Sequence, residues 1–110
     1  MSDRLPSGML VSALLRQAND AGGLGVVLAR GDAQAGAILV IAEEHGTVRL
    51  LERGLDATGR AALVESGPQH PASADEVSTY WQKRRRSDPD LWVLELIVPS
   101  AKRLVAETLL

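Results

Sequence analysis

The chain has 110 residues, of which 45% are apolar and 24% charged, and its formal net charge is −2. This balance is typical of a soluble globular domain, and the charge gives no overall attraction to phosphate polymers or anionic lipid. The sequence contains no cysteine, which excludes disulfides, thiolate catalysis and cysteine-based metal sites. A chain of this length builds one core, so we expect a single domain over residues 1–110.

The sequence predicts neither secretion nor insertion into a membrane. Residues 1–6 lack the basic and apolar regions of a secretory signal. The apolar run at residues 37–42 is too short to cross a bilayer. We therefore expect a cytoplasmic protein with no membrane partner.

The first expected element is a helix beginning at Ser7, a residue type suited to capping. Its apolar residues recur at helical spacing on one side. They are Leu10, Val11, Leu14, Leu15 and Ala18. Gly22 and Gly23 then stop the helix, with one glycine available for a left-handed position.

Three strands are expected next, at residues 24–30, 37–43 and 47–53. The second is almost entirely apolar, as is typical of a central strand whose two faces are both covered. The connections at residues 31–36 and 44–46 are short and contain glycine. Short connections predict antiparallel neighbours, and the glycines would supply positive φ at tight reversals. The pattern therefore predicts a meander.

Residues 60–65 are expected to add a fourth strand at the edge of the sheet. Residues 67–71 contain two prolines and predict a loop. Ser73 and Glu76 then have the spacing of a capping box. The helix that they begin should run to the basic residues 83–86.

Residues 91–98 predict a last strand, interrupted only by Glu95, and residues 101–110 a last helix. The order α-β-β-β-β-α-β-α predicts an α+β fold: an antiparallel β-meander of four to five strands with three helices on one face. Four residues are expected in the core of the sheet: Ile38, Val40, Leu94 and Leu96.

A polar site could form near the tip of the first hairpin. Its candidate ligand-binding residues are Arg30, Asp32, Arg49 and Trp92. Loops carried on a rigid sheet are common functional positions, but an Asp at a turn can equally bond its own backbone. A small enzyme would need Arg30, Asp32 and Arg49 in one concave pocket. Trp92 is also expected to join the second helix to the last strand, because residues 88–90 turn the chain before it.

The basic end of the second helix suggests an alternative, a nucleic-acid surface. Its candidate residues are Trp81, Lys83, Arg84, Arg85 and Arg86. Arginine can clamp phosphate through two hydrogen bonds. The favoured interpretation is a solvated helix end, because positive charge there complements the helix dipole.

No catalytic residue can be assigned from the sequence. The serines lie in no nucleophile motif and beside no histidine. His45 and His70 fall in expected loops without the spacing of metal ligands, so we expect no metal site and no cofactor.

Four segments are similar to a family of short alphaproteobacterial proteins: residues 12–16, 30–36, 50–53 and 88–93. The glycine-containing tip and the Asp-Pro-Asp-Leu-Trp segment are the most specific of these. The chain thus resembles domain-of-unknown-function family 1491 over nearly its whole length. The resemblance implies a stand-alone cytoplasmic protein and brings no activity, cofactor or catalytic residue.

The expected function is a small non-enzymatic binding or interaction module that self-associates as a homodimer. A meander leaves a sheet edge to cover, the last helix ends in two leucines, and two-fold pairing commonly covers such surface. The alternatives are a nucleic-acid-associated protein using residues 83–86, or a small enzyme with a polar site near Arg30, Asp32 and Arg49. The sequence specifies no small-molecule ligand.

Overall fold

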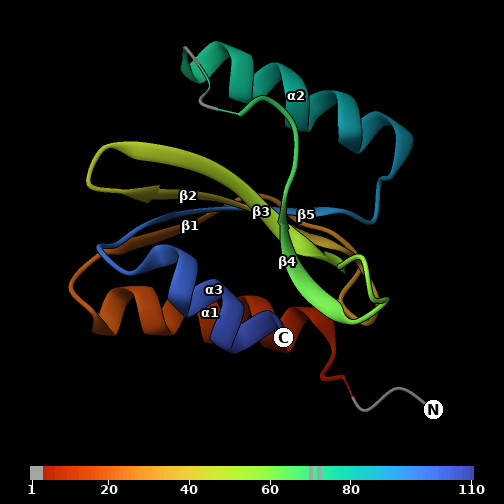
Figure 1. Ribbon diagram of the computed structural model, residues 1–110, viewed down its shortest axis with the longest axis horizontal. Coiled ribbons are helices and arrows are strands. Elements are labelled where there is room, and N and C mark those ends of the chain that lie inside the picture. Colours follow the sequence, from red (N-terminus) through yellow and green to blue (C-terminus); the bar gives the residue numbers. More distant parts are fainter. Residues whose placement is uncertain (1–3, 70, 72) are drawn as a thin grey trace.

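The computed structural model describes residues 4–69, 71 and 73–110, and it has the predicted α+β class and order of elements. The elements are α1 (Ser7–Asp20), β1 (Leu24–Ala29), β2 (Ile38–Glu44), β3 (Thr47–Leu55), β4 (Ala61–Glu65), α2 (Ala74–Ser87), β5 (Trp92–Ile97) and α3 (Ala101–Leu109). Three layers result, with α2 on one face of the sheet and α1 and α3 on the other (Figure 1). None of the described helices has the length and apolar character that a membrane span requires.

The five strands form one mixed sheet in the order β1-β5-β2-β3-β4. Strands β2, β3 and β4 make the predicted antiparallel meander. Strand β5 enters between β1 and β2, antiparallel to β1 and parallel to β2. The prediction that β1 and β2 are neighbours is therefore wrong. Strand β5 lies between them, so β1 and β2 are about 10 Å apart across the sheet.

The connection between β1 and β2 passes close to the turn before β5. A Cβ atom on Gly31 or Gly36 would lie 2.1 or 2.2 Å from the Asp90 carbonyl oxygen. The Asp32 amide donates a hydrogen bond to that same oxygen at 3.0 Å. Neither glycine has positive φ, unlike Gly46 in the β2–β3 turn. Close backbone approach, and not the predicted φ, therefore requires glycine at these two positions.

The larger core lies between the sheet and the pair α1 and α3. The four predicted sheet residues are confirmed as buried, with no more than 5% of any of them exposed: Ile38, Val40, Leu94 and Leu96. The helices contribute Leu10, Leu14, Leu104 and Val105 among others. The core is aliphatic apart from one large ring, Trp92.

Trp92 lies on this face, opposite the one that α2 covers. Its indole Nε1 donates a hydrogen bond of 2.7 Å to the Asp32 carbonyl oxygen. The predicted junction between the second helix and the last strand is therefore wrong. The ring instead fixes the β1–β2 connection to β5, because that connection crosses the start of β5.

A smaller core lies between the sheet and α2. Its buried members are Leu39, Ile41, Leu50, Val77, Leu91 and Val93. The expectation that all helices share one face is wrong. Strands β2 and β5 are apolar on both sides, so each of their faces needs a covering layer.

The two serines at helix starts behave differently. Ser73 caps α2, because its Oγ accepts a hydrogen bond of 3.2 Å from the Glu76 amide. Ser7, predicted to cap α1, is the first residue of that helix and is buried. Its Oγ donates to the Gly36 carbonyl oxygen at 2.6 Å, which ties α1 to the β1–β2 connection.

Candidate functional site

Helix α2 has the fewest buried side chains of the three helices. Of its residues, all of which are described, Val77 alone is buried, while Tyr80 and Trp81 pack partly buried against the smaller core. Few apolar contacts therefore hold this helix to the sheet. Polar contacts fix its C-terminal half, and a cavity lies under its N-terminal half.

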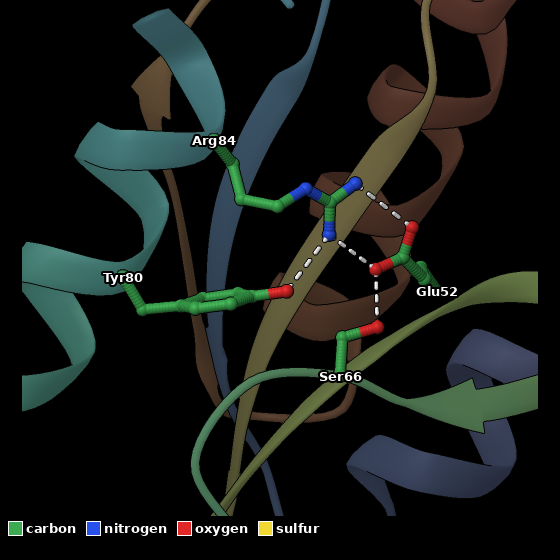
Figure 2. Close-up of polar contacts among 4 residues, drawn as sticks. All are labelled: Glu52, Ser66, Tyr80 and Arg84. Carbon is green, nitrogen blue, oxygen red and sulfur yellow. Dashed lines mark hydrogen bonds and ion pairs between the residues drawn. The ribbon is translucent and has the colours of Figure 1, made fainter. Parts of the chain in front are cut away.

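A polar network joins the C-terminal half of α2 to β3 and to the end of β4 (Figure 2). Arg84 donates two hydrogen bonds to Glu52, at 2.5 Å from Nη1 to Oε2 and 3.1 Å from Nη2 to Oε1. Ser66 donates to the same Oε2, and Arg84 Nη1 also donates to the Tyr80 hydroxyl at 3.1 Å. Because the four residues come from three parts of the chain, the network anchors α2.

The network also sets the protonation of its members. Burial of Glu52 raises the pKa of its carboxyl group, but hydrogen bonds from Arg84 and Ser66 and the Arg84 charge more than offset it. The pKa of Glu52 therefore lies below its ordinary value of 4.5. The hydrogen bonds with Glu52 likewise raise the pKa of Arg84. An ionised, fully hydrogen-bonded carboxylate is suited to structure and poorly suited to proton transfer near neutral pH.

Arg85 holds the same end of α2 to the backbone beneath it. Its Nη1 donates hydrogen bonds of 3.0 Å to the carbonyl oxygens of Arg30 and Leu91, and a further one to that of Pro89. These carbonyl groups follow β1 and precede β5. One guanidinium group thus joins α2 to two neighbouring strands of the sheet.

A cavity of about 570 Å³ lies between the N-terminal half of α2 and the sheet. Its apolar lining includes Leu28, Ile41, Val48, Val77 and Trp81. Small-molecule sites in proteins are usually clefts of about 300–1,000 Å³ with apolar walls and a few polar groups. This cavity has that size and that composition.

Two carboxylate residues, Glu43 of β2 and Glu95 of β5, also line the cavity. In the parallel pair Glu43 lies opposite Ile97, and Glu95 lies opposite Ile41. The two glutamates are thus one strand apart and two residues along, which by ordinary strand dimensions is about 8 Å between their Cα atoms. Within the described part of the chain, no lysine or arginine lines the cavity.

The structure brings three of the four predicted ligand-binding residues together. The Arg30 guanidinium carbon lies 5.6 Å from the centre of the Trp92 ring, and Trp92 bonds the Asp32 carbonyl oxygen. Asp32 Oδ2 accepts hydrogen bonds from the amides of Gln34 (3.2 Å) and Ala35 (2.8 Å). These contacts form a structural turn, and ligand binding by these residues stays a prediction.

Arg49, the fourth predicted residue, lies elsewhere on the sheet. Its Nη1 is 3.7 Å from Glu65 Oε1 of β4. It lies opposite Ala42 of β2, whereas Trp92 lies opposite Ile38. Four residues of β2, about 13 Å, therefore separate their positions along the sheet. The geometry gives no support to a catalytic pocket that combines Arg49 with the other three.

The predicted nucleic-acid residues are also distributed. Trp81 packs against the smaller core and lines the cavity, and Arg84 and Arg85 make the contacts described above. Lys83 and Arg86 are exposed. Two exposed cations at this helix end, on a chain with a net charge of −2, give no geometric support to a phosphate-binding surface.

Sequence reasoning missed Glu43 and Glu95 as candidate site residues. A signal existed: Glu95 is the one charged residue of β5, and Glu43 directly follows five apolar residues of β2. Their proximity depends on the parallel pairing of β2 with β5, which no local pattern predicts.

Comparisons with known proteins agree with this architecture. The model of a family described as protein of unknown function (DUF1491) matches residues 5–106. The chain belongs to the DUF1491 family. The resemblance noted in the sequence is thereby confirmed. A search of curated proteins finds no match to the chain.

Solved structures extend the likeness to the fold of most of the chain. A crystal structure of a DUF1491 protein from Caulobacter crescentus CB15 is 29% identical, with a TM-score of 0.78, over 92% of this chain and 94% of that one. An NMR structure of a DUF1491 protein from the same organism is 30% identical, with a TM-score of 0.73, over 91% of each chain. A solution structure from A. tumefaciens is 29% identical, with a TM-score of 0.68, over 86% of each.

Proposed function

We propose that this chain is a small non-enzymatic binding module that acts as a homodimer joined through its β1 strands. The observation that supports the proposal is the open edge of β1. Among the described residues, the backbone of Leu24–Ala29 makes hydrogen bonds only within the β1–β5 pair. The strand contains no charged residue and no proline, which are the usual protections of an edge.

Exposed apolar side chains follow the same edge. Leu24, Val26 and Leu28 are 51%, 37% and 38% exposed, and Ile97, opposite Leu24 on β5, is 36% exposed. Contiguous exposed apolar side chains on a protein surface mark interaction sites. The other edge strand, β4, ends in Glu65, which is paired with Arg49.

Two-fold symmetry suits this edge. Antiparallel pairing centred on Val26 sets it opposite the partner's Val26. It brings Leu24 near the partner's Leu28, which lies at the register irregularity between Val27 and Ala29. The apolar row then packs against itself, and the two sheets become one. Such a self-complementary contact is the commonest form of a soluble homodimer.

Light scattering on Val26→Lys tests the proposal. We expect twice the monomer mass for the wild-type chain at micromolar concentration and the monomer mass for the variant, because the two-fold axis sets like charges side by side. Leu55→Lys introduces the same charged side chain at a residue of β3 that is 67% exposed, and should leave the dimer intact. A wild-type monomer mass that does not rise on tenfold concentration would contradict the proposal.

A cytoplasmic location belongs to the same proposal. Fractionation of cells that express a tagged chain tests it, with the chain expected in the cytosolic fraction.

A further inference from the structure

We propose that the cavity beneath α2 binds a small organic ammonium ion, with its apolar body against the aliphatic walls and its cation between Glu43 and Glu95. This site goes beyond the proposed self-association, and the two carboxylates that would hold the cation are not part of the β1 edge. Three features of the cavity support it: its volume, the charge of its lining and its aromatic residue Trp81.

The volume and walls of the cavity suit a small apolar molecule. The cavity, of about 570 Å³, lies between α2 and the sheet. Ile41 and Val48 line it from the sheet, and Val77 and Trp81 line it from the helix. Displacing water from such walls is favourable for a hydrocarbon group. An apolar body is therefore the part of the ligand that the walls recognise.

The charge of the cavity lining determines which charged group the ligand should have. Glu43 and Glu95 bring two negative charges into a mostly apolar space, and no hydrogen bond or ion pair joins either carboxylate to a described residue. His45 lines a neighbouring depression together with Glu43, but not this cavity. Two like charges in such a space repel each other, and a cation between them removes the repulsion. An anionic ligand would add to it.

Trp81 supplies the third recognition element. Trp81, on α2, lines the same cavity as the two carboxylate residues of the sheet. The face of an indole ring attracts ammonium groups more strongly than any other aromatic side chain does. Ser73 and Ser78 also line the cavity, but their hydroxyl oxygens already accept hydrogen bonds from the Glu76 amide and from Gln82.

A titration followed by ¹⁵N–¹H NMR tests the site with three probes of equal length: hexylammonium, hexan-1-ol and hexanoate. We expect hexylammonium to shift the amide signals of Ile41 and Val77 and the indole signal of Trp81. Its dissociation constant should be at least tenfold lower than that of hexan-1-ol. Hexanoate should leave these signals unchanged.

The double variant Glu43→Gln/Glu95→Gln keeps the shape of both side chains and removes both charges. It should bind hexylammonium no more tightly than hexan-1-ol, whereas Glu107→Gln, an exposed change on α3, should bind it as the wild type does. Equal affinity of the wild type for hexylammonium and hexan-1-ol would overturn the proposal. So would tight hexylammonium binding by the double variant, or shifts confined to another surface.

The two proposals can fail separately. Light scattering on the double variant Glu43→Gln/Glu95→Gln measures self-association in a chain whose cavity has lost both charges, and we expect the dimer mass of the wild type. A dimeric double variant that no longer prefers hexylammonium to hexan-1-ol supports both proposals. A stable dimer whose cavity signals do not respond to hexylammonium overturns this one alone.

Discussion

Gly36 shows how closely backbone segments approach one another in this protein. A methyl group there would meet the Asp90 carbonyl oxygen at 2.2 Å, so Gly36→Ala should lower the free energy of unfolding by roughly 1–3 kcal/mol. Gly8→Ala is the matched control, because its Cβ would meet nothing closer than 3.5 Å and alanine favours the helix by about 0.5–1 kcal/mol. Urea denaturation of both variants measures the difference. Equal stability of Gly36→Ala and wild type would contradict the observed crossing.

Leu94 lies in β5 with none of its surface exposed. Leu94→Ala leaves a cavity between β5 and the helices α1 and α3. We therefore expect the free energy of unfolding to fall by about 2–5 kcal/mol. Leu55→Ala, at a residue that is 67% exposed, should change it by less than about 0.5 kcal/mol. Similar values for the two variants in urea denaturation would show that Leu94 is not a core residue.

Burial of single residues could be predicted from the sequence, but their polar partners could not. Ile38 and Leu94 follow from apolar runs alone, because a strand covered on both faces has no polar side. Ser7 and Trp92 were misplaced because their partners, Gly36 and Asp32, lie far along the chain. Only the folded arrangement brings those carbonyl groups within reach.

At the scale of elements, helix and strand positions were predicted well and their neighbours less well. Local periodicity and turn residues set the bounds of each element. The insertion of β5 depends on how α2 returns the chain across the sheet, and no local pattern encodes that return. The candidate site could not be predicted for the same reason, because Glu43 and Glu95 become neighbours only through the β2–β5 pair.

The attachment of α2 should depend on pH through Glu52. Its pKa is lowered in the folded protein, so its contribution to stability is present above pH 4.5 and disappears as the pH falls through the lowered pKa. We expect Glu52→Gln to be less stable than the wild type by roughly 1–3 kcal/mol at pH 7, because Arg84 loses its charged acceptor. That difference should shrink in strongly acidic buffer.

Urea denaturation of both chains between pH 2.5 and 7, about the range over which carboxyl groups titrate, measures this effect. Glu107→Gln removes the exposed pair with Arg103 and should change little at any pH. A difference between Glu52→Gln and wild type that does not vary with pH would show that the Arg84 contact does not stabilise the charged form.

At the scale of the whole molecule, the two proposals concern adjoining surfaces. We propose that the β1 edge binds a second copy of the chain and that the cavity under α2 binds a small cation. Leu28 lines the cavity and also belongs to the exposed row of β1, so the two surfaces adjoin. Under the two proposals, the dimer interface would therefore lie next to the ligand site.

The position of β5 between β1 and β2 has a consequence for synthesis on the ribosome. Strands β2, β3 and β4 can pair as soon as they emerge, but β1 and the inner side of β2 have no partner until β5 leaves the exit tunnel. A nascent chain therefore carries two unpaired, apolar strand surfaces, and such surfaces favour misassembly. Folding of this sheet must finish late, and a chaperone that shields nascent strands should raise its yield.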